Sequence, residues 1–414
     1  MLSKRAEKSL GMPNLLYTSW KKQQDNPYDA EANPTGIINL GTAENNIIYD
    51  IINKKLSEIN LGKMEESYTH YCKFTGMDVF RTSLSRFFQM FMSPRVSVTP
   101  DEIFVTNGGG VAIETLGQIL CDEGEGVLTP APYYKAFKTD LEQRFATRLC
   151  PFHFSDDFKI TMKDLKAIHQ KVTERGIKIK ALLISHPINP LGSFYTKEQL
   201  LMLLEYCWSS QIHLICDEIY MLSVYDDKHM SFVNLLGIHN IHKYLNIIHI
   251  VWSFSKTFAL SGFRCGVIIT FNALVQKALL SLSYYTTSST LTQYVVQEMI
   301  SDLDWVKVLK STTQNRLLRS RGLVVARLNE MNIPYILPTS GMFIVFNISK
   351  FLREKTEKAE LELFDRFMKH GVYVVPGTNL EFSEPGWFRL IISNKLEIIE
   401  VGISRIIDAL NCND

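Results

Sequence analysis

The chain has 414 residues, of which 46% are hydrophobic and 21% charged, so it has room for two or three folding units and is neither disordered nor collagen-like. Lys and Arg total 44 against 43 for Asp and Glu, and like charges do not gather in long runs. Because nucleic-acid binding relies on a basic excess or a basic stripe, we expect no nucleic-acid partner.

The seven cysteines are odd in number and widely spaced, and none form a CxxC pair, which disfavours a disulfide framework or a structural metal site. The N-terminal residues show no apolar core of signal-peptide length. The most apolar stretches, 245–254 and 265–275, are interrupted by polar residues well before the ~18 residues that a membrane span needs. We therefore expect a cytoplasmic protein without a metal ion or a membrane span.

Residues 1–36 are polar and contain several prolines, and they are expected to form an irregular arm, with a helical pattern beginning near residue 45. Between residues 100 and 270, short apolar β-rich runs alternate with helical patterns. The β-rich runs are 103–106, 126–129, 181–185, 213–216, 247–252 and 266–270, and the helical patterns are 111–120, 134–143, 162–174 and 197–209. This alternation predicts βαβ units and a mostly parallel sheet between two helix layers.

The pattern changes after about residue 305. It predicts a long helix, further short strands and a terminal helix, at 305–331, 342–347, 360–370, 372–375, 388–392 and 395–410. We therefore predict an α/β fold with two domains. A three-layer α/β/α large domain with a mostly parallel sheet spans 46–304, and a smaller α+β domain combines 1–45 with 305–414.

The segment 251–266 carries the first candidate site. A strand leads into Ser253, Ser255 and Lys256, and Arg264 follows eight residues after the lysine. A lysine just past a buried strand is partly desolvated, which favours the neutral amine that can form a Schiff base with a carbonyl. Two hydroxyls and a guanidinium suit a phosphate. Taken alone, Lys256 is more often a loop lysine beside a structural arginine.

Two further strand exits carry polar side chains. Asp217 follows one apolar strand, with Tyr220 three residues later, and Asn189 follows another. Alone, Asp217 could equally cap a helix, and the segment around Asn189 could be only a turn. However, Asn189, Asp217 and Lys256 are 28 and 39 residues apart, about one βαβ unit per step. We therefore expect them to converge at one sheet edge, where ligands bind in open α/β sheets.

A glycine cluster, TNGGGVA at 106–112, lies between a strand and a helix. The backbone N–H groups of Gly109 and Gly110 could face an anion at the positive end of that helix. The cluster is not GxGxxG, and no acid follows at the ribose-binding spacing, which disfavours a nicotinamide dehydrogenase. Tyr134, at the next strand exit, could stack on a planar ring, although packing is the commoner role of such an aromatic.

Together these segments resemble the fold-type I pyridoxal-phosphate enzymes of the class I/II aminotransferase family, and within it the 1-aminocyclopropane-1-carboxylate synthase-like branch. The likeness is carried by NPYDAEANPTGIINLGTAEN (26–45), FTGMDVFR (74–81), APYYKAF (131–137), NPLG (189–192), DEIY (217–220), SFSK (253–256), SGFR (261–264) and EPGWFR (384–389). It implies pyridoxal 5'-phosphate, an amino-acid substrate, transaminase or synthase-like lyase chemistry, and a homodimer. The alternative is an inactive homologue that binds the cofactor or a partner without turnover.

The resemblance also implies roles for individual residues. Lys256 would hold the cofactor as a Schiff base and act as general base, while Asp217 would pair with the pyridine nitrogen. Asn189 and Tyr220 would contact the phenolic oxygen. The ring would stack on Tyr134, and the phosphate would be held by Gly109, Gly110, Ser253, Ser255 and Arg264.

On the substrate side, the resemblance implies that Arg389 binds the α-carboxylate and that Ala43 and Glu44 lie near the substrate. Three positions depart from the family pattern. Phe74 stands where the family places a tyrosine that reaches the partner subunit's site, Gly110 replaces a hydroxyl residue, and His186 replaces an asparagine. We expect Phe74 to face the partner's site, and the lost hydroxyls to weaken cofactor retention and the cyclising elimination.

Overall fold

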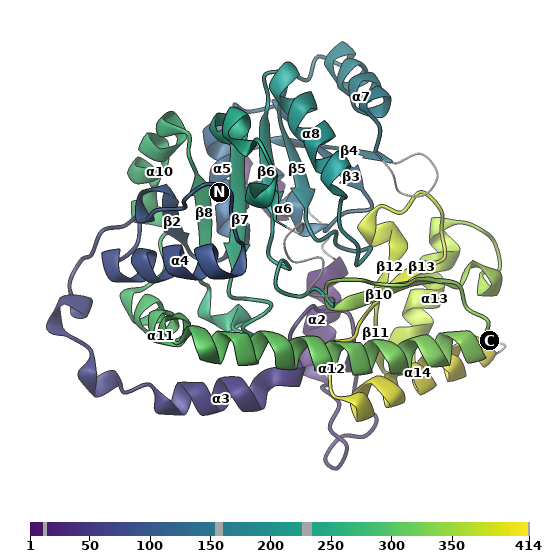
Figure 1. Cartoon of the computed structure of the whole chain (residues 1–414). Coiled ribbons are helices and arrows are strands. Elements are labelled where there is room, and N and C mark those ends of the chain that lie inside the picture. The colour runs from purple at the N-terminus through teal and green to yellow at the C-terminus, as the bar shows by residue number, and fades with distance from the viewer. Residues whose placement is uncertain (11–14, 154–159, 226–233, 413–414) are drawn as a thin grey trace.

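The protein is described by a computed structural model that covers residues 1–10, 15–153, 160–225 and 234–412. Within these residues the central sheet has seven strands in the order β2-β8-β7-β6-β5-β3-β4 (Figure 1). Their bounds are β2 Ile103–Thr106, β3 Gly126–Ala131, β4 Arg148–His153, β5 Ile179–Ser185, β6 His213–Asp217, β7 Ile248–Ser253 and β8 Gly266–Thr270. Strand β8 is antiparallel to both of its neighbours and the other pairs are parallel, so the predicted α/β class with a mostly parallel sheet is confirmed.

Helices cover both faces of this sheet, because alternate strand residues point to opposite sides. Helices α5 (Gly109–Leu120), α6 (Ala136–Glu142) and α10 (Ala273–Thr286) pack on the face that contains Leu183 and Ile215. The opposite face, with Leu182 and Leu214, is covered by α4 (Asp78–Phe91), α7 (Met162–Glu174) and α8 (Lys197–Ser209). Both faces of the central strands are therefore mostly apolar, and the buried polar side chains within them, such as His249 and Thr129, are hydrogen-bonded to neighbouring strands.

A second, antiparallel sheet follows later in the chain, with the order β12-β13-β10-β9. Its strands are β9 Tyr335–Ile336, β10 Phe343–Asn347, β12 Val375–Pro376 and β13 Trp387–Ile391. Helices α13 (Glu357–Lys369) and α14 (Leu396–Asn411) pack beside it, and the long α12 (Leu303–Glu330) runs along the base of the molecule beneath both sheets (Figure 1). Helices α3 (Tyr49–Glu58) and α11 (Thr290–Ser301) lie near the start of α12.

The N-terminal segment packs against the C-terminal part of the chain. Strand β1 (Ile38–Asn39) pairs in parallel with β11 (Val372–Tyr373). This contact is compatible with assigning 1–45 and 305–414 to one domain, and the boundaries at 46 and 304 stay a prediction.

The expectation of an irregular arm over residues 1–36 is wrong, because this segment contains α1 (Lys4–Leu10) and α2 (Leu15–Asp25). Helix α2 forms because Leu15 and Leu16 pack on the core while Ser19 and Gln23, spaced by four residues, are buried. Strand β4 was also not predicted, because it is an edge strand that contains a proline and its exposed positions, 148, 151 and 153, do not follow a regular alternation. No helix of the described residues is long and apolar enough to cross a membrane.

Candidate functional site

A cavity of about 240 Å³ opens at the carboxyl ends of β5 and β6, beside the loop that follows β7. Nine of the residues predicted for the site line it: Gly109, Gly110, Tyr134, Asn189, Asp217, Tyr220, Ser255, Lys256 and Arg264. The cavity is also lined by Ile113, Ala136, Asp140, Ile219 and Ser261, which the sequence did not point to. The structure thus brings together segments that lie more than 140 residues apart in the sequence, such as those of Gly109 and Lys256.

The amine of Lys256 lies in this cavity, three residues beyond the end of β7. Its Nζ donates a 2.7 Å hydrogen bond to the carbonyl oxygen of Ala43. Burial and the positive charge of Arg389 lower the pKa of Lys256 to about 8, against the opposing effect of Glu44 and Asp217. Near pH 8 about half of the amines are therefore neutral and nucleophilic.

The carboxyl group of Asp217 lies at the end of β6, in register with Ser185 on β5 and Val251 on β7. Burial raises the pKa of Asp217 to about 7, although the 3.2 Å hydrogen bond from the Ile219 backbone N–H and the charge of Lys256 lower it. The residues that follow Asp217 form turns, so the alternative that it caps a helix is wrong. A carboxyl so poor in partners is suited to a cationic or N–H group of a ligand.

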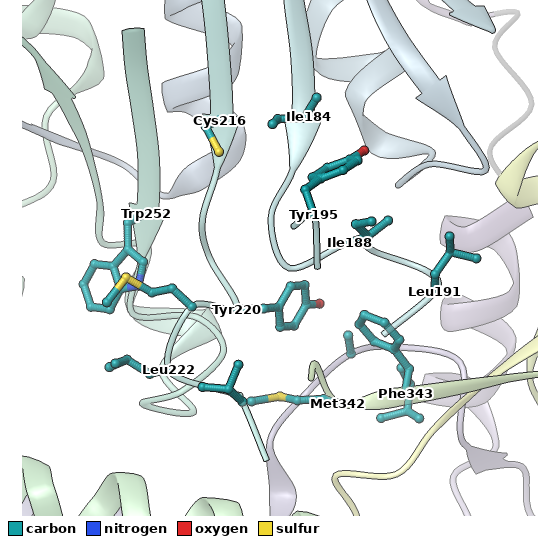
Figure 2. Packing of buried hydrophobic residues seen from close by; sticks show 14 of the residues in the cluster. Ile184, Ile188, Leu191, Tyr195, Cys216, Tyr220, Leu222, Trp252, Met342 and Phe343 are labelled. Carbon is teal, nitrogen blue, oxygen red and sulfur yellow. The ribbon is translucent and has the colours of Figure 1, made fainter. Parts of the chain in front are cut away.

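Tyr220 connects the end of β6 to the second sheet. Figure 2 shows its ring extending from the loop after β6 toward Phe343 on β10, and the two rings meet edge to face with centroids 5.3 Å apart. Burial raises the pKa of Tyr220 well above its ordinary value, so its hydroxyl stays a neutral hydrogen-bond donor. On the other side of the cavity, burial raises the pKa of Tyr134 to about 12, and its ring lies edge-on to Phe137.

The guanidinium of Arg389 comes from β13 of the second sheet and is 3% exposed. Nη1 donates to Oδ1 of Asn189 at 2.9 Å, and Nη2 donates to the carbonyl oxygen of Gly41 at 2.8 Å. Nε has no hydrogen-bond partner among the described residues. Arg389 does not line the cavity itself; it contacts Asn189, which does, so a carboxylate bound there would have to compete with these two internal acceptors.

An anion-binding corner forms where α5 begins. Gly108 precedes the helix with a φ of +95°, and a Cβ there would lie 2.6 Å from the guanidinium of Arg264. Arg264 donates to the carbonyl oxygen of Ser261 at 2.9 Å. Unbonded N–H groups at a helix start, next to a guanidinium, attract an anion.

The two predicted serines lie differently. Ser255 lines the cavity, whereas Ser253 is fully buried within β7 and its Oγ accepts a 3.3 Å hydrogen bond from the Ser255 backbone N–H. Ala43 and Glu44 lie beside the cavity rather than on its lining: Ala43 binds the amine of Lys256, and the Glu44 carboxylate accepts a 3.4 Å hydrogen bond from Ser261.

Asp140 on α6 is the charged residue that the sequence did not point to. Its carboxyl lines the anion-binding corner, and burial together with the charges of Glu114 and Asp217 raises its pKa to about 8, against the effect of Arg264. In the sequence it resembles any acid of a helix, and only the fold places it at the cavity. No group of three or more His, Cys, Asp or Glu suited to a metal ion occurs within the described parts of the chain.

Two positions that depart from the family pattern lie outside the cavity lining. The ring of Phe74 meets Tyr284 edge to face at 5.1 Å and Tyr71 at 6.1 Å. His186 is buried and stacks on Tyr195, whose backbone N–H lies 3.4 Å from its Nδ1.

Comparison with known proteins gives a consistent result. The family model for aminotransferase class I and II matches residues 35–406. The 1-aminocyclopropane-1-carboxylate synthase-like protein 1 of Bos taurus is 31% identical over 388 residues, which cover 92% of this chain and 77% of that protein. The 1-aminocyclopropane-1-carboxylate synthase 7 of Arabidopsis thaliana is 32% identical, covering 96% of this chain and 92% of that protein.

A further curated protein and a solved structure are also similar to this chain over most of its length. A Homo sapiens protein named "Probable inactive 1-aminocyclopropane-1-carboxylate synthase-like protein 2" is 29% identical and covers 95% of this chain and 71% of its own length. Among solved structures, aspartate aminotransferase from Thermus thermophilus with maleate has a TM-score of 0.79 at 21% identity, and the match covers 99% of both chains. At that identity the likeness establishes the fold.

Proposed function

Because the chain belongs to the aminotransferase class I and II family, we propose that it binds pyridoxal 5'-phosphate in the 240 Å³ cavity and acts there on an amino acid. The observation that carries the proposal is the pairing of two groups in one cavity: the amine of Lys256, whose pKa is lowered to about 8, and the buried carboxyl of Asp217, to which the described residues supply one hydrogen-bond donor. The first suits an aldehyde and the second suits a pyridine nitrogen.

The residues present fit the groups of this cofactor. Asp217 would accept a hydrogen bond from the ring nitrogen and stabilise its protonated form, which satisfies the poorly paired carboxyl. Asn189 and Tyr220 would face the phenolic oxygen, and Tyr134 the ring. The phosphate would lie against Gly109, Gly110, Ser255 and Arg264. Ser253 would act only through Ser255, whose backbone it holds.

When bound, the cofactor supplies an electron sink for the negative charge that develops at the α-carbon of an amino acid. Lys256 would hold the cofactor through its amine and would serve as the general base that takes the α-proton of the amino acid. Asp217 would accept a hydrogen bond from the ring nitrogen and so favour its protonated form. Arg389 would orient the substrate carboxylate near Ala43 and Glu44. It would donate from Nε and from one further N–H, which would first have to leave its present acceptor on Asn189 or Gly41.

The decisive experiment is visible absorption after incubation with pyridoxal phosphate, followed by borohydride reduction and peptide mass mapping. The parent protein should become coloured and carry the reduced adduct on Lys256. The Lys256→Ala variant should stay colourless, while Lys277→Ala, which removes an exposed lysine of α10, should behave as the parent. A parent protein that remains colourless would overturn the proposal.

Specific observations favour a second candidate function, in which the chain is a synthase-like homologue that binds the cofactor or a partner without turnover. It is supported by similarity to the human protein named as probably lacking activity, and by Phe74, Gly110 and His186. An amino-donor screen distinguishes the two, because stoichiometric conversion of any amino acid, with a spectral shift to the amine form of the cofactor, excludes the inactive alternative. Transamination and synthase-like lyase chemistry separate by their products in the same screen.

The assembly we propose is a homodimer. An aromatic patch consists of three exposed tyrosines, Tyr71, Tyr284 and Tyr285, around the half-buried Phe74, with Tyr71 and Tyr285 exposed by 93% and 79%. Contiguous exposed aromatics favour a protein interface, and the family resemblance makes a second copy the partner, with Phe74 toward its site. Light scattering should give a dimer mass for the parent and a monomer mass for Tyr285→Glu, whereas Leu361→Glu on α13 leaves the dimer intact.

The remaining part of the proposal is a cytoplasmic location. Within the described residues the seven cysteines are free thiols, and five of them are buried, which suits a reducing compartment. Fractionation of cells with an antibody to this chain tests it, and recovery in a membrane or secreted fraction would contradict it.

A further inference from the structure

Asp140 occupies an unusual place for an acid. It lies on α6, and its carboxyl lines the anion-binding corner together with Gly109, Gly110 and Arg264. Among the described residues no hydrogen bond or ion pair to this carboxyl occurs, so both oxygens are available to a ligand. An ionised carboxylate there would repel any phosphate that the helix start and the guanidinium attract.

The position of Asp140 matches the side chain that Gly110 lacks. A Cβ built on Gly110 would lie 3.4 Å from Oδ1 and 3.6 Å from Oδ2 of Asp140. The carboxyl therefore lies within van der Waals distance of the point where a side chain at position 110 would begin. The three heavy atoms nearest to that Cβ all belong to the carboxyl group of Asp140.

The surroundings favour the neutral acid. Glu114 on α5 and Asp217 on β6 place negative charge near Asp140, and these effects add to burial in raising its pKa to about 8. Arg264 opposes them, and Tyr134 is a neutral neighbour with a pKa near 12. The charge of Glu114 is partly offset by Arg144, at 2.9 Å. A bound phosphate dianion would raise the pKa of Asp140 further, because it disfavours a second negative charge in the corner.

We propose that Asp140 binds the phosphate of the cofactor as the neutral acid, donating its carboxyl hydrogen to a phosphate oxygen in place of the hydroxyl that Gly110 lacks. The inference rests on the proposed function, because it takes pyridoxal phosphate as the ligand. Its consequence is that phosphate binding takes up or retains one proton at Asp140. The affinity for pyridoxal phosphate then falls as pH rises through the range in which Asp140 of the cofactor-free protein loses its proton.

The test compares pyridoxal phosphate with pyridoxal, which has the same aldehyde and ring and no phosphate. Dissociation constants of both are measured by fluorescence titration at pH 7.0 and 9.5, where the phosphate stays a dianion because its second ionisation is near pH 6. Both ligands react with the amine of Lys256 through the same aldehyde. The pH dependence of that amine therefore cancels in the ratio of the two dissociation constants. In the parent protein the advantage of pyridoxal phosphate should fall about 30-fold between the two pH values, as linkage to one proton with a pKa of about 8 requires.

Three variants sharpen the test. Asp140→Asn donates an N–H at every pH, so its ratio should be the same at pH 7.0 and 9.5. Asp140→Val cannot donate, so its ratio should be low at both. Asp365→Asn, which removes an exposed acid on α13, should keep the fall of the parent.

A parent ratio that changes less than threefold overturns the inference without any variant, and so does an Asp140→Asn protein that keeps the parent slope. Circular dichroism establishes that each variant is folded. If neither ligand binds the parent at pH 7.0, the proposed function itself fails. That result is distinct from tight binding of both ligands with a ratio that does not respond to pH.

Discussion

Oδ1 of Asn189 accepts a 2.9 Å hydrogen bond from Nη1 of Arg389, although 200 residues separate them in the sequence. Asn189 follows β5 of the seven-stranded sheet, and Arg389 lies on β13 of the four-stranded sheet. The bond therefore joins the two sheets at the cavity, and it also places a cation near Lys256. Several consequences of this arrangement can be measured.

The first concerns the amine of Lys256. Its pKa is lowered to about 8 by burial and then by Arg389, so the rate of its reaction with pyridoxal should rise from pH 7 to 9 with a midpoint near 8. In Arg389→Gln one of the charges that lower this pKa is gone, while burial and Arg264 still lower it and Glu44 and Asp217 raise it, so the midpoint should move to higher pH. Stopped-flow absorbance against pH measures it. Arg319→Gln, at an exposed position of α12, is the control, and an unchanged midpoint in Arg389→Gln would contradict the prediction.

The second concerns the stability of the cofactor-free protein. Burial raises the pKa of Asp217 from about 4 in the unfolded chain to about 7 in the folded protein. Between these values the unfolded state ionises first, so stability falls as pH rises from 4 to 7 and stays low above 7.

Asp217→Asn cannot ionise and can still accept from Ile219. It should therefore be more stable than the parent at pH 8, by on the order of 2–4 kcal/mol, and nearly equal to it at pH 4. Urea unfolding at the two pH values measures the difference. A variant that is less stable than the parent at pH 8 would show that the carboxylate is well solvated.

The third concerns the backbone behind the anion-binding corner. A Cβ on Gly266 would lie 2.7 Å from the carbonyl carbon of Gly108, so β8 and the start of α5 approach at a distance that only glycine permits. Gly266→Ala should lower the free energy of unfolding by about 1–3 kcal/mol and weaken pyridoxal phosphate more than pyridoxal. Gly262→Ala, four residues earlier in the chain and with open space around its Cβ, is the matched control. Equal stability of the two variants would contradict the conclusion that the approach of β8 to α5 requires glycine at position 266.

The fourth concerns a buried acid outside the cavity. Glu360 on α13 is fully buried and accepts hydrogen bonds from the Thr378 backbone N–H at 2.7 Å, the Thr378 hydroxyl at 2.8 Å and the Gly386 backbone N–H. Glu360→Ala leaves these donors unpaired, so it should cost about 3–5 kcal/mol of stability in urea unfolding. Glu362→Ala, at an exposed position of the same helix, should change stability by less than about 0.5 kcal/mol. If both variants lost a similar amount of stability, the loss would come from helix α13 itself and not from the hydrogen bonds between Glu360 and the segment before β13.

Much of the fold and part of the site could be predicted because they depend on local order. Strands that run between buried helices must be apolar on both faces, so their bounds are readable, and α7 and α8 occupy the predicted residues. Polar side chains at the exits of parallel strands must meet at one edge, which explains why Asn189, Asp217 and Lys256 share a cavity. Helix α2 of the N-terminal segment was not predicted, because it is stabilised by Leu15 and Leu16 packing on the core, which local sequence does not reveal.

The sequence by itself determined the α/β class and the three side chains at the strand exits, because periodicity and chain order are enough to place them. Only the tertiary structure decided which groups join them. Arg389 reaches Asn189 from a different sheet, and Ser253 is buried at the end of β7, where its hydroxyl accepts a hydrogen bond from the Ser255 backbone N–H. Asp140 is an ordinary helix acid until α6 packs beside Gly110, where burial and neighbouring carboxylates change its pKa. Distances between segments remote in sequence, and the desolvation that follows from them, are properties of the packed molecule.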